Sequence, residues 1–226
     1  MVGIAYNTSI VRNGLVLHLD AANKKSYPGT GTIWSDLSGI GNNSTLYNGV
    51  TYINNSMYYD GISEYTGFNR LQFNDLVPFT IFAFIRLETG ANGDEALDRR
   101  TVLGDNAVGS QLGFYSTNST SPATGGFSIW NTSSVGPTFA CNKQKGDIFS
   151  IAITRDSSNA AKGYVDGSLV GTSSLTSIVQ FNETGRRAGG FRHFYGNIYE
   201  LKIYNRVLFD NEIQQNFNAM RGRYNV

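Results

Sequence analysis

The sequence predicts an all-β protein, built from antiparallel strands and closed by one short C-terminal helix. Apolar residues alternate with polar ones in several short segments, which is the pattern of strands with one buried face. Gly, Asn, Ser and Asp separate these segments at regular spacing, as turns do. Charged residues make up 15% of the 226 residues, well below the usual share of about 25%. Long exposed helices, whose surfaces are rich in Glu, Lys and Arg, are therefore not expected.

The first strand is expected over Leu15–Leu19. Three leucines at alternate positions share one face of it, and His18 and Asp20 share the other. A long Gly-, Asn- and Ser-rich loop follows, with Trp34 as its apolar anchor. The segment Phe79–Leu87, "FTIFAFIRL", is apolar on both faces, so it is expected in the middle of a sheet that is covered on each side.

Shorter strands are expected along the rest of the chain. "SMYYDGISEYTGF" predicts two strands around an Asp60-Gly61 turn, and "GNIYELKIYNR" predicts the last strand. Asp166-Gly167 lies between two strand-like runs, and this dipeptide favours the tight primed turn of a hairpin. The remaining strands are expected in "RTVLGD", "SQLGFYS", "GGFSIWNT" and "DIFSIAITR".

A helix is expected over residues 209–220, because Ile213, Phe217 and Met220 form one apolar stripe at helical spacing. The chain has no internal repeat, linker or change of composition. It is therefore expected to form one domain over residues 1–226, with residues 1–12 as an N-terminal arm. A two-sheet sandwich or jelly roll and a barrel both fit this pattern of strands.

Composition argues against several classes of protein. A net charge of +1 gives no long-range attraction to nucleic acid, and the pairs Arg99-Arg100 and Arg186-Arg187 are expected to be solvated or paired locally. Cys141 is the single cysteine, which excludes an intrachain disulfide and favours a buried, inert thiol. No apolar run approaches about 18 residues, so no membrane insertion is expected. The first residues lack the features of a signal peptide.

Four segments resemble the laminin-G-like branch of the concanavalin A-like lectins. In chain order they are residues 14–49 ("GLVLHLDAANKKSYPGTGTIWSDLSGIGNNSTLYNG"), 58–68 ("YYDGISEYTGF"), 163–172 ("GYVDGSLVGT") and 196–224 ("GNIYELKIYNRVLFDNEIQQNFNAMRGRY"). The chain looks most like the stand-alone version among structural proteins of tailed bacteriophages, which begins near its methionine and ends soon after an Arg-Gly-Arg-aromatic sequence. The resemblance implies a jelly-roll sandwich of two curved antiparallel sheets. It also implies a role in carbohydrate recognition, adhesion or the outer parts of virions.

One position departs from the family pattern. Related sequences usually place Ser before the final helix and Glu three residues later, which makes a capping box. Here Phe209 holds the Ser position, whereas Glu212 is kept. Asp210 is expected to cap the helix instead.

Enzymatic activity is not expected. Retaining glycosidases need two carboxyl groups about 5–5.5 Å apart, which laminarinase-like relatives supply as Glu-x-Asp-x-x-Glu on one strand. None of the six glutamates has Asp two places on; they are Glu64, Glu88, Glu95, Glu183, Glu200 and Glu212. The chain also lacks a Gly-x-Ser-x-Gly nucleophile elbow. His18 is therefore expected as a surface or inter-subunit contact, and Asp20 as a residue that shapes a turn.

Sugar binding would use aromatic faces and planar polar groups. Side chains of these kinds fall at predicted strand ends and loops. The candidate ligand or interface residues are Tyr115, Trp130, Asn131, Arg192, His193 and Tyr195. A core position for Trp130, and a subunit contact for Arg192 and His193, are the alternatives.

No cofactor is expected, and binding of a structural Ca²⁺ is kept as an alternative. Members of the superfamily hold Ca²⁺ through Asp, Asn and carbonyl oxygens in loops, and such residues here are Asp20, Asp36, Asn42 and Asp60. No segment has the dense Asp pattern of a self-contained calcium loop. Asp20 and Asp60 are expected to fix turns.

The resemblance and the missing catalytic motif favour a non-catalytic structural protein on the outside of a tailed-phage virion, assembled in the host cytoplasm. Its expected partners are capsid, neck or tail proteins, host-surface glycans and a second copy of itself. Head decoration, neck attachment and tail attachment all stay open. The alternatives are a secreted carbohydrate-binding module or polysaccharide-active enzyme of the same fold, and an intracellular lectin-like adaptor.

Overall fold

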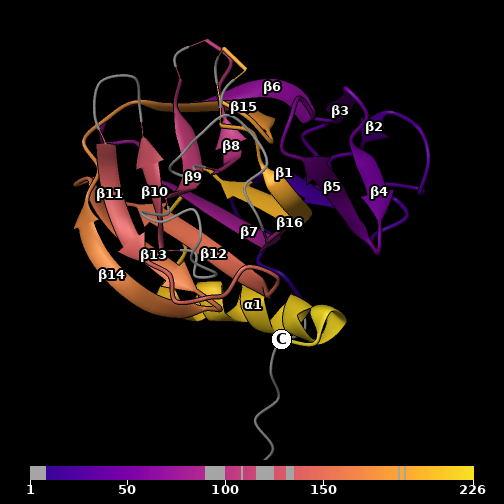
Figure 1. Ribbon diagram of the computed structural model, residues 1–226. Coiled ribbons are helices and arrows are strands. Elements are labelled where there is room, and N and C mark those ends of the chain that lie inside the picture. Colours follow the sequence, from indigo (N-terminus) through magenta and orange to yellow (C-terminus); the bar gives the residue numbers. More distant parts are fainter. Residues whose placement is uncertain are drawn as a thin grey trace, which may run out of the picture.

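The computed structural model describes residues 9–89, 100–107, 109–115, 125–130, 135–187, 189–190 and 192–226. In these residues, two antiparallel sheets of eight strands each form a sandwich, and one helix packs on the outside of the first sheet (Figure 1). The predicted two-sheet jelly-roll sandwich is confirmed.

The first sheet, sheet A, has the order β14-β13-β12-β7-β16-β5-β4, with β1 also paired to β16. Its strands are β1 (Leu15–Asp20), β4 (Thr51–Ile53), β5 (Ser56–Asp60), β7 (Phe79–Leu87), β12 (Ile148–Arg155), β13 (Ala160–Val165), β14 (Ser168–Ser174) and β16 (Tyr195–Tyr204). The strand predicted at the centre of a sheet, β7, lies between β12 and β16, and its residues are buried apart from the partly buried Arg86.

The second sheet, sheet B, has the order β11-β10-β9-β8-β15-β6-β3-β2. Its strands are β2 (Ile33–Trp34), β3 (Ser44–Tyr47), β6 (Tyr65–Phe73), β8 (Arg100–Gly104), β9 (Gln111–Tyr115), β10 (Gly126–Trp130), β11 (Val135–Ala140) and β15 (Val179–Thr184). Strands β5 and β6 flank the Asp60-Gly61 turn as predicted. They belong to different sheets, so this turn carries the chain across the sandwich.

The β13–β14 hairpin confirms the turn predicted at Asp166-Gly167. Both residues have positive φ, at 48° and 76°, as a type I′ turn requires. The Asp166 carboxylate also accepts a hydrogen bond from the Ser150 backbone N–H at 2.8 Å, which ties the turn to β12.

The main core lies between the sheets and contains Leu17, Leu19, Trp34 and Cys141. The prediction that Leu15 shares this face is wrong. A shift of register between Leu15 and Leu17 turns Leu15 towards a second apolar cluster, outside sheet A. Such a bulge interrupts the alternation of side chains on which the prediction depended.

Helix α1 (Asp210–Tyr224) covers this second cluster and extends four residues beyond the predicted end. Its predicted stripe of Ile213, Phe217 and Met220 is buried against the outer face of sheet A, where the Phe217 and Phe84 rings lie 6.0 Å apart. The described part of the chain contains no helix with the length and apolar character needed to cross a membrane.

The prediction that Asp210 caps this helix is wrong. Phe209 is the N-cap residue, and its backbone N–H donates to Glu212 Oε2 at 2.9 Å. Asp210 Oδ1 instead accepts hydrogen bonds from Lys162 Nζ at 2.9 Å and the Tyr164 hydroxyl at 2.7 Å. The carboxylate therefore ties the start of the helix to β13.

Candidate functional site

The outer faces of the two sheets differ in their cover. Helix α1 lies along the outer face of sheet A, and no helix of the described chain lies on sheet B (Figure 1). A pocket of 410 Å³ opens on sheet B over β3, β6 and β15. Its lining residues are Asn43, Thr45, Tyr47, Tyr65, Gly67, Phe68, Asn69, Asn106, Asn182, Glu183 and Arg186.

Strand alternation places two tyrosines in this pocket. Leu46 and Phe68 are buried in the core, so the neighbouring residues Tyr47 and Gly67 face outwards. The β3–β6 register pairs Tyr47 with Tyr65. Their rings are stacked, with centroids 4.7 Å apart and planes at 13°, and Tyr47 is 41% exposed. An aromatic surface is thus accessible from solvent.

Gly67 gives the Tyr47 ring its room. A Cβ at this position would lie 3.3 Å from Tyr47 Cε2, closer than ordinary van der Waals contact. The absence of a side chain therefore lets the ring lie across β6.

An ion pair forms the wall beside these rings. Arg186 donates from Nε to Glu183 Oε2 at 3.0 Å and from Nη2 to Glu183 Oε1 at 2.9 Å. These hydrogen bonds raise the pKa of Arg186. The Arg186 Cζ also lies 3.3 Å from the centroid of the Tyr65 ring, so one guanidinium serves both the carboxylate and the aromatic ring. The prediction that Arg186 is paired locally is confirmed.

Asparagine amides supply most of the other polar groups. Three of them have an oxygen engaged within the protein: Asn43 Oδ1 accepts from the Asp36 backbone N–H, Asn182 Oδ1 from that of Asn106, and Asn106 Oδ1 from Arg70 Nη2. Within the described residues their Nδ2 groups have no hydrogen-bond partner. The hydrogen bonds to Oδ1 fix the orientation of these side-chain amides. The pocket therefore offers oriented Nδ2 donors beside an aromatic ring.

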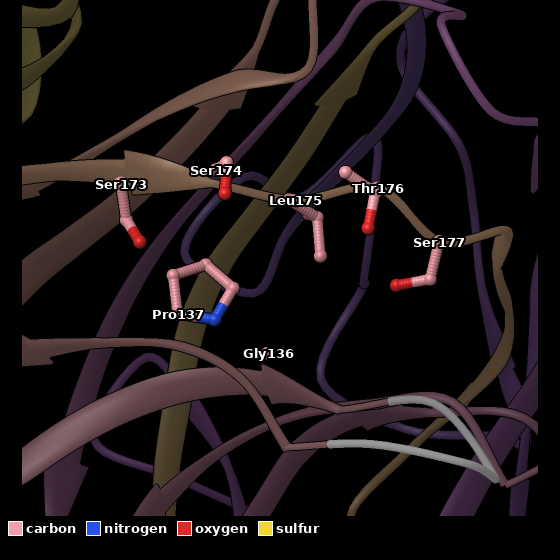
Figure 2. Close-up of a pocket in the computed structure, with 7 residues that line it drawn as sticks. All are labelled: Gly136, Pro137, Ser173, Ser174, Leu175, Thr176 and Ser177. Carbon is pink, nitrogen blue, oxygen red and sulfur yellow. The ribbon is translucent and has the colours of Figure 1, made fainter.

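A second pocket, of 240 Å³, lies between β11 and the segment that follows β14. Figure 2 shows its lining: Gly136, Pro137, Ser173, Ser174, Leu175, Thr176 and Ser177. Its described lining residues offer hydroxyl groups but include neither an aromatic nor a charged side chain, so they give a sugar ring no surface on which to stack. The pocket on sheet B is the stronger candidate.

The structure brings two of the predicted site residues together. The Arg192 Cζ lies 5.8 Å from the Trp130 ring. Trp130 is 8% exposed and lies over β9, where a Cβ on Gly113 would meet its ring at 3.2 Å. It therefore offers little open aromatic surface.

His193 and Tyr195 lie outside the lining of the sheet B pocket. His193 is at the limit of burial, with Nε2 2.7 Å from the Gly190 carbonyl oxygen. The half-buried Tyr195 ring lies 6.4 Å from that of Tyr58 and 5.3 Å from the Arg100 Cζ. Asn131 and the side chain of Tyr115 lie outside the described residues.

Arg100 was expected to be solvated or paired locally, and its burial contradicts the first of these alternatives. Its Nη1 donates to the backbone carbonyl oxygens of Glu88 and Tyr195, at 2.7 and 2.9 Å. Burial on β8 leaves the guanidinium to satisfy carbonyl groups that water would otherwise bind.

The prediction that His18 is a surface or inter-subunit contact is wrong, because the side chain is buried. His18 Nε2 lies 2.9 Å from Glu200 Oε1, and Lys202 pairs with the other oxygen of this carboxylate. Burial by itself would raise the pKa of Glu200, but Lys202 and His18 together lower it to about 2. The carboxylate is therefore charged at neutral pH.

His18, Asp20 and Glu200 have ligand-type atoms within 4.8 Å of one another, a spacing that a metal ion could use. Two cations of the chain already compensate the acids. Lys202 pairs with Glu200, and Arg223 Nη1 donates to both oxygens of Asp20 at 2.8 and 2.9 Å. We interpret this group as a structural ion network between β1, β16 and α1.

The acidic residues considered for calcium are held by donors of the chain itself. Asp36 accepts hydrogen bonds from the backbone N–H groups of His18, Ser38 and Asn42. Asp20 and Asp60 each accept one from the residue two places on, so their predicted role in fixing turns is confirmed.

The sequence prediction missed the tyrosine pair of the sheet B pocket. A signal for it exists, because alternation in "STLY" and "YTGF" sets Tyr47 opposite to Leu46, and Tyr65 opposite to Thr66. Alternation does not say which strands are neighbours, so it could not place the two rings side by side.

Comparisons with known proteins agree with this architecture. Residues 60–214 match the family model described as the concanavalin A-like lectin/glucanases superfamily. No curated protein matches the chain.

Solved structures share the fold at low sequence identity. A mutant Trypanosoma rangeli sialidase displaying trans-sialidase activity is 17% identical, with a TM-score of 0.64 over 96% of this chain and 34% of its own. A structure of botulinum neurotoxin type C, whose cell entry depends on two ganglioside molecules, is 15% identical, with a TM-score of 0.61 over 93% and 52%. The binding domain of botulinum neurotoxin DC in complex with SialylT is also 15% identical, with a TM-score of 0.61 over 92% and 52%.

The chain thus spans about a third of the sialidase and about half of the toxin chains, and these likenesses concern the fold alone. The family match covers most of the chain and extends from β5 into α1. This chain belongs to the concanavalin A-like lectin/glucanases superfamily.

Proposed function

We propose that this chain is a non-catalytic glycan-binding protein, and that the pocket on the outer face of sheet B holds the sugar. One observation carries the proposal: the exposed Tyr47 ring, stacked on Tyr65, lies beside amide donors that are not engaged within the described chain. A sugar presents a C–H face that packs on an aromatic ring and hydroxyl groups that pair with amides. The volume of 410 Å³ falls in the range of about 300–1,000 Å³ typical of small-molecule sites.

The acid groups of the pocket support binding rather than hydrolysis. Glu183 is the one carboxylate among its described lining residues, and Arg186 holds both of its oxygens. A retaining glycosidase needs a second carboxyl group about 5–5.5 Å away, and one of the pair must be able to give up a proton. Glu183 has both oxygens bonded to Arg186 and no second carboxylate beside it among the described lining residues, so it is placed for neither role.

We place the protein on the outside of a tailed-phage virion, assembled in the host cytoplasm, with capsid, neck or tail proteins as its partners. The resemblance of residues 14–49 and 196–224 to stand-alone phage structural proteins supports this setting. The open face of sheet B would then be directed away from the particle, towards glycans of the host surface. Mass spectrometry of purified particles tests the setting, since absence of the chain from them would contradict it.

Glycan-array binding tests the proposed site. Tyr47→Ala is expected to weaken binding at least about tenfold, which corresponds to about 1.4 kcal/mol of lost contact with the ring. Tyr52→Ala is the matched control, because Tyr52 belongs to β4 of sheet A and lies outside the pocket lining. Its ring packs against that of Tyr27, with centroids 5.2 Å apart.

Two results would contradict the proposal. One is binding that Tyr47→Ala leaves unchanged in a variant that still folds, as judged by its melting temperature. The other is release of reducing sugar from a glucan that is lost on Glu183→Gln, which would make the protein an enzyme.

A further inference from the structure

We infer that the sheet B pocket selects uncharged sugars and rejects sialylated and other acidic glycans; this inference rests on the proposed function and names the ligand class of the same site. The charge balance of the pocket supports this inference. Among the described lining residues, those that titrate are Arg186, Glu183 and the two tyrosines. One further ion pair, Arg70 with Asp105, adjoins the pocket through Asn106.

Arg186 is already engaged by an acid. A guanidinium recognises a carboxylate best through two parallel N–H···O bonds, and Arg186 makes this arrangement with Glu183. Its side chain is also packed on the Tyr65 ring. A sugar carboxylate would have to displace Glu183, which is 3% exposed, and would leave that acid buried without its partner.

Arg70 is engaged in the same way. Its Nε donates to Asp105 Oδ2 at 2.8 Å, and its Nη2 donates to Asn106 Oδ1 at 3.1 Å. The Asp105 side chain is fully buried, so this pair too is costly to open. The charges of the two arginines and the two carboxylates cancel, and no lysine is among the lining residues that the structure describes.

The remaining groups suit hydroxyl groups. The Nδ2 donors of Asn43, Asn106 and Asn182 are neutral, and the side chain of Asn69 is exposed. Neutral amides can pair with sugar oxygens without a net charge on the ligand. An acidic sugar would lose the hydration of its carboxylate here and gain no cation in return, which is unfavourable.

This arrangement differs from what the names of the structural neighbours would suggest. These neighbours include a toxin that depends on gangliosides, a toxin domain in complex with SialylT and a sialidase in complex with sialic acid. Their likeness to this chain concerns the fold alone. The side chains on the sheet face decide the ligand, and here they form a charge-balanced surface.

The test is a set of paired glycans, each presented with and without a terminal sialic or uronic acid, titrated against the full chain by calorimetry. Binding is expected only for neutral members, with the acidic partner at least about tenfold weaker. Affinity is also expected to change little between low and high salt, since no net charge pair forms across the interface. Preference for the acidic members overturns the inference while leaving glycan binding in place. Binding to no member of any pair overturns the proposed function, and the inference with it.

Two variants sharpen the test. Glu183→Gln releases Arg186 and is expected to raise affinity for acidic glycans at least about tenfold. Asn69→Lys places a new cation at an exposed position without disturbing either ion pair, so it serves if Glu183→Gln does not fold, and it should change selectivity in the same direction. Failure of a folded variant to gain acidic ligands would show that charge does not set the specificity.

Discussion

The outer faces of the two sheets carry similar side chains, which are buried under a helix on sheet A and border an open pocket on sheet B. On sheet A, the group of His18, Glu200 and Lys202 is buried. Arg223 of α1 joins this group through its ion pair with Asp20. On sheet B, Arg186 and Glu183 make an equally close pair, but they stand beside the exposed Tyr47. Each face therefore combines an ion pair with aromatic rings. The presence or absence of a covering helix makes one group part of the core and the other a candidate binding surface.

This contrast is also energetic. A fully buried ion pair repays the cost of desolvation only while both partners are present. Ion pairs at exposed positions contribute little to stability, about 0–1 kcal/mol. Buried ion-paired carboxylates on both sheets are thus constrained by folding, whereas the exposed Tyr47 and Asn69 of sheet B are available for recognition.

The largest effect is expected for Lys202→Met. Lys202 and Glu200 are fully buried, and the substitution leaves the charge of Glu200 to His18 alone. We expect a loss of about 3–5 kcal/mol in the free energy of unfolding, measured by urea denaturation. The control is Lys162→Met on the same sheet, whose pair with Asp210 is largely exposed and is worth at most about 1 kcal/mol. Equal losses in the two variants would show that burial of the ion pair does not set its contribution to stability.

A smaller effect is expected for Glu64→Gln, in the turn that connects β5 of sheet A to β6 of sheet B. Burial raises the pKa of Glu64 to about 7, and its Oε2 accepts the Asp60 backbone N–H at 2.5 Å. The folded state thus holds a proton that the unfolded chain releases near its ordinary pKa of 4.5. Stability from this group therefore falls as the pH rises from 4.5 to about 7.

Glutamine keeps the acceptor and removes the titration. Glu64→Gln is expected to be about 1–2 kcal/mol more stable than the native chain at pH 8, with a much smaller difference at pH 4.5. Urea denaturation at both pH values measures it. A constant difference between the two would mean that Glu64 titrates normally and that the turn between the sheets is open to water.

The smallest effect on stability is expected for Gly67→Ala on the open face. The added methyl group would meet Tyr47 Cε2 at 3.3 Å, and the exposed ring can move away. We expect a change in unfolding free energy within about 0.5 kcal/mol and roughly threefold weaker glycan binding, because the ring is displaced. Gly222→Ala in α1 has open space around it. It should leave binding unchanged and stabilise the helix by up to about 1 kcal/mol. Unchanged binding in Gly67→Ala would show that glycan recognition does not depend on the position of the Tyr47 ring.

Local patterns were sufficient for most individual elements. Two-sided apolar character identified β7 as a central strand, Asp166-Gly167 identified the β13–β14 hairpin, and the apolar stripe that includes Phe217 identified α1. Each signal depends on residues within about ten positions of one another, where backbone geometry alone sets which side chains share a face.

Local patterns were not sufficient for the partners of these elements. His18 and Asp20 share a strand face as predicted, yet their burial depends on Arg223 and the helix that carries it, 203 residues beyond Asp20. The bulge beside Leu15 and the capping of α1 by Phe209 were missed for a related reason, since register and tertiary contacts set both.

The candidate site shows the same division. Residues near one another in the chain determine that Tyr47 and Tyr65 face away from the core. The order of strands in sheet B determines that these rings stack and that Arg186, from beyond β15, joins them. Alternation is a property of one strand, whereas a binding surface is formed by side chains of several neighbouring strands. Pairing between distant strands is settled by the packing of the whole core, so it appears only when the chain is folded.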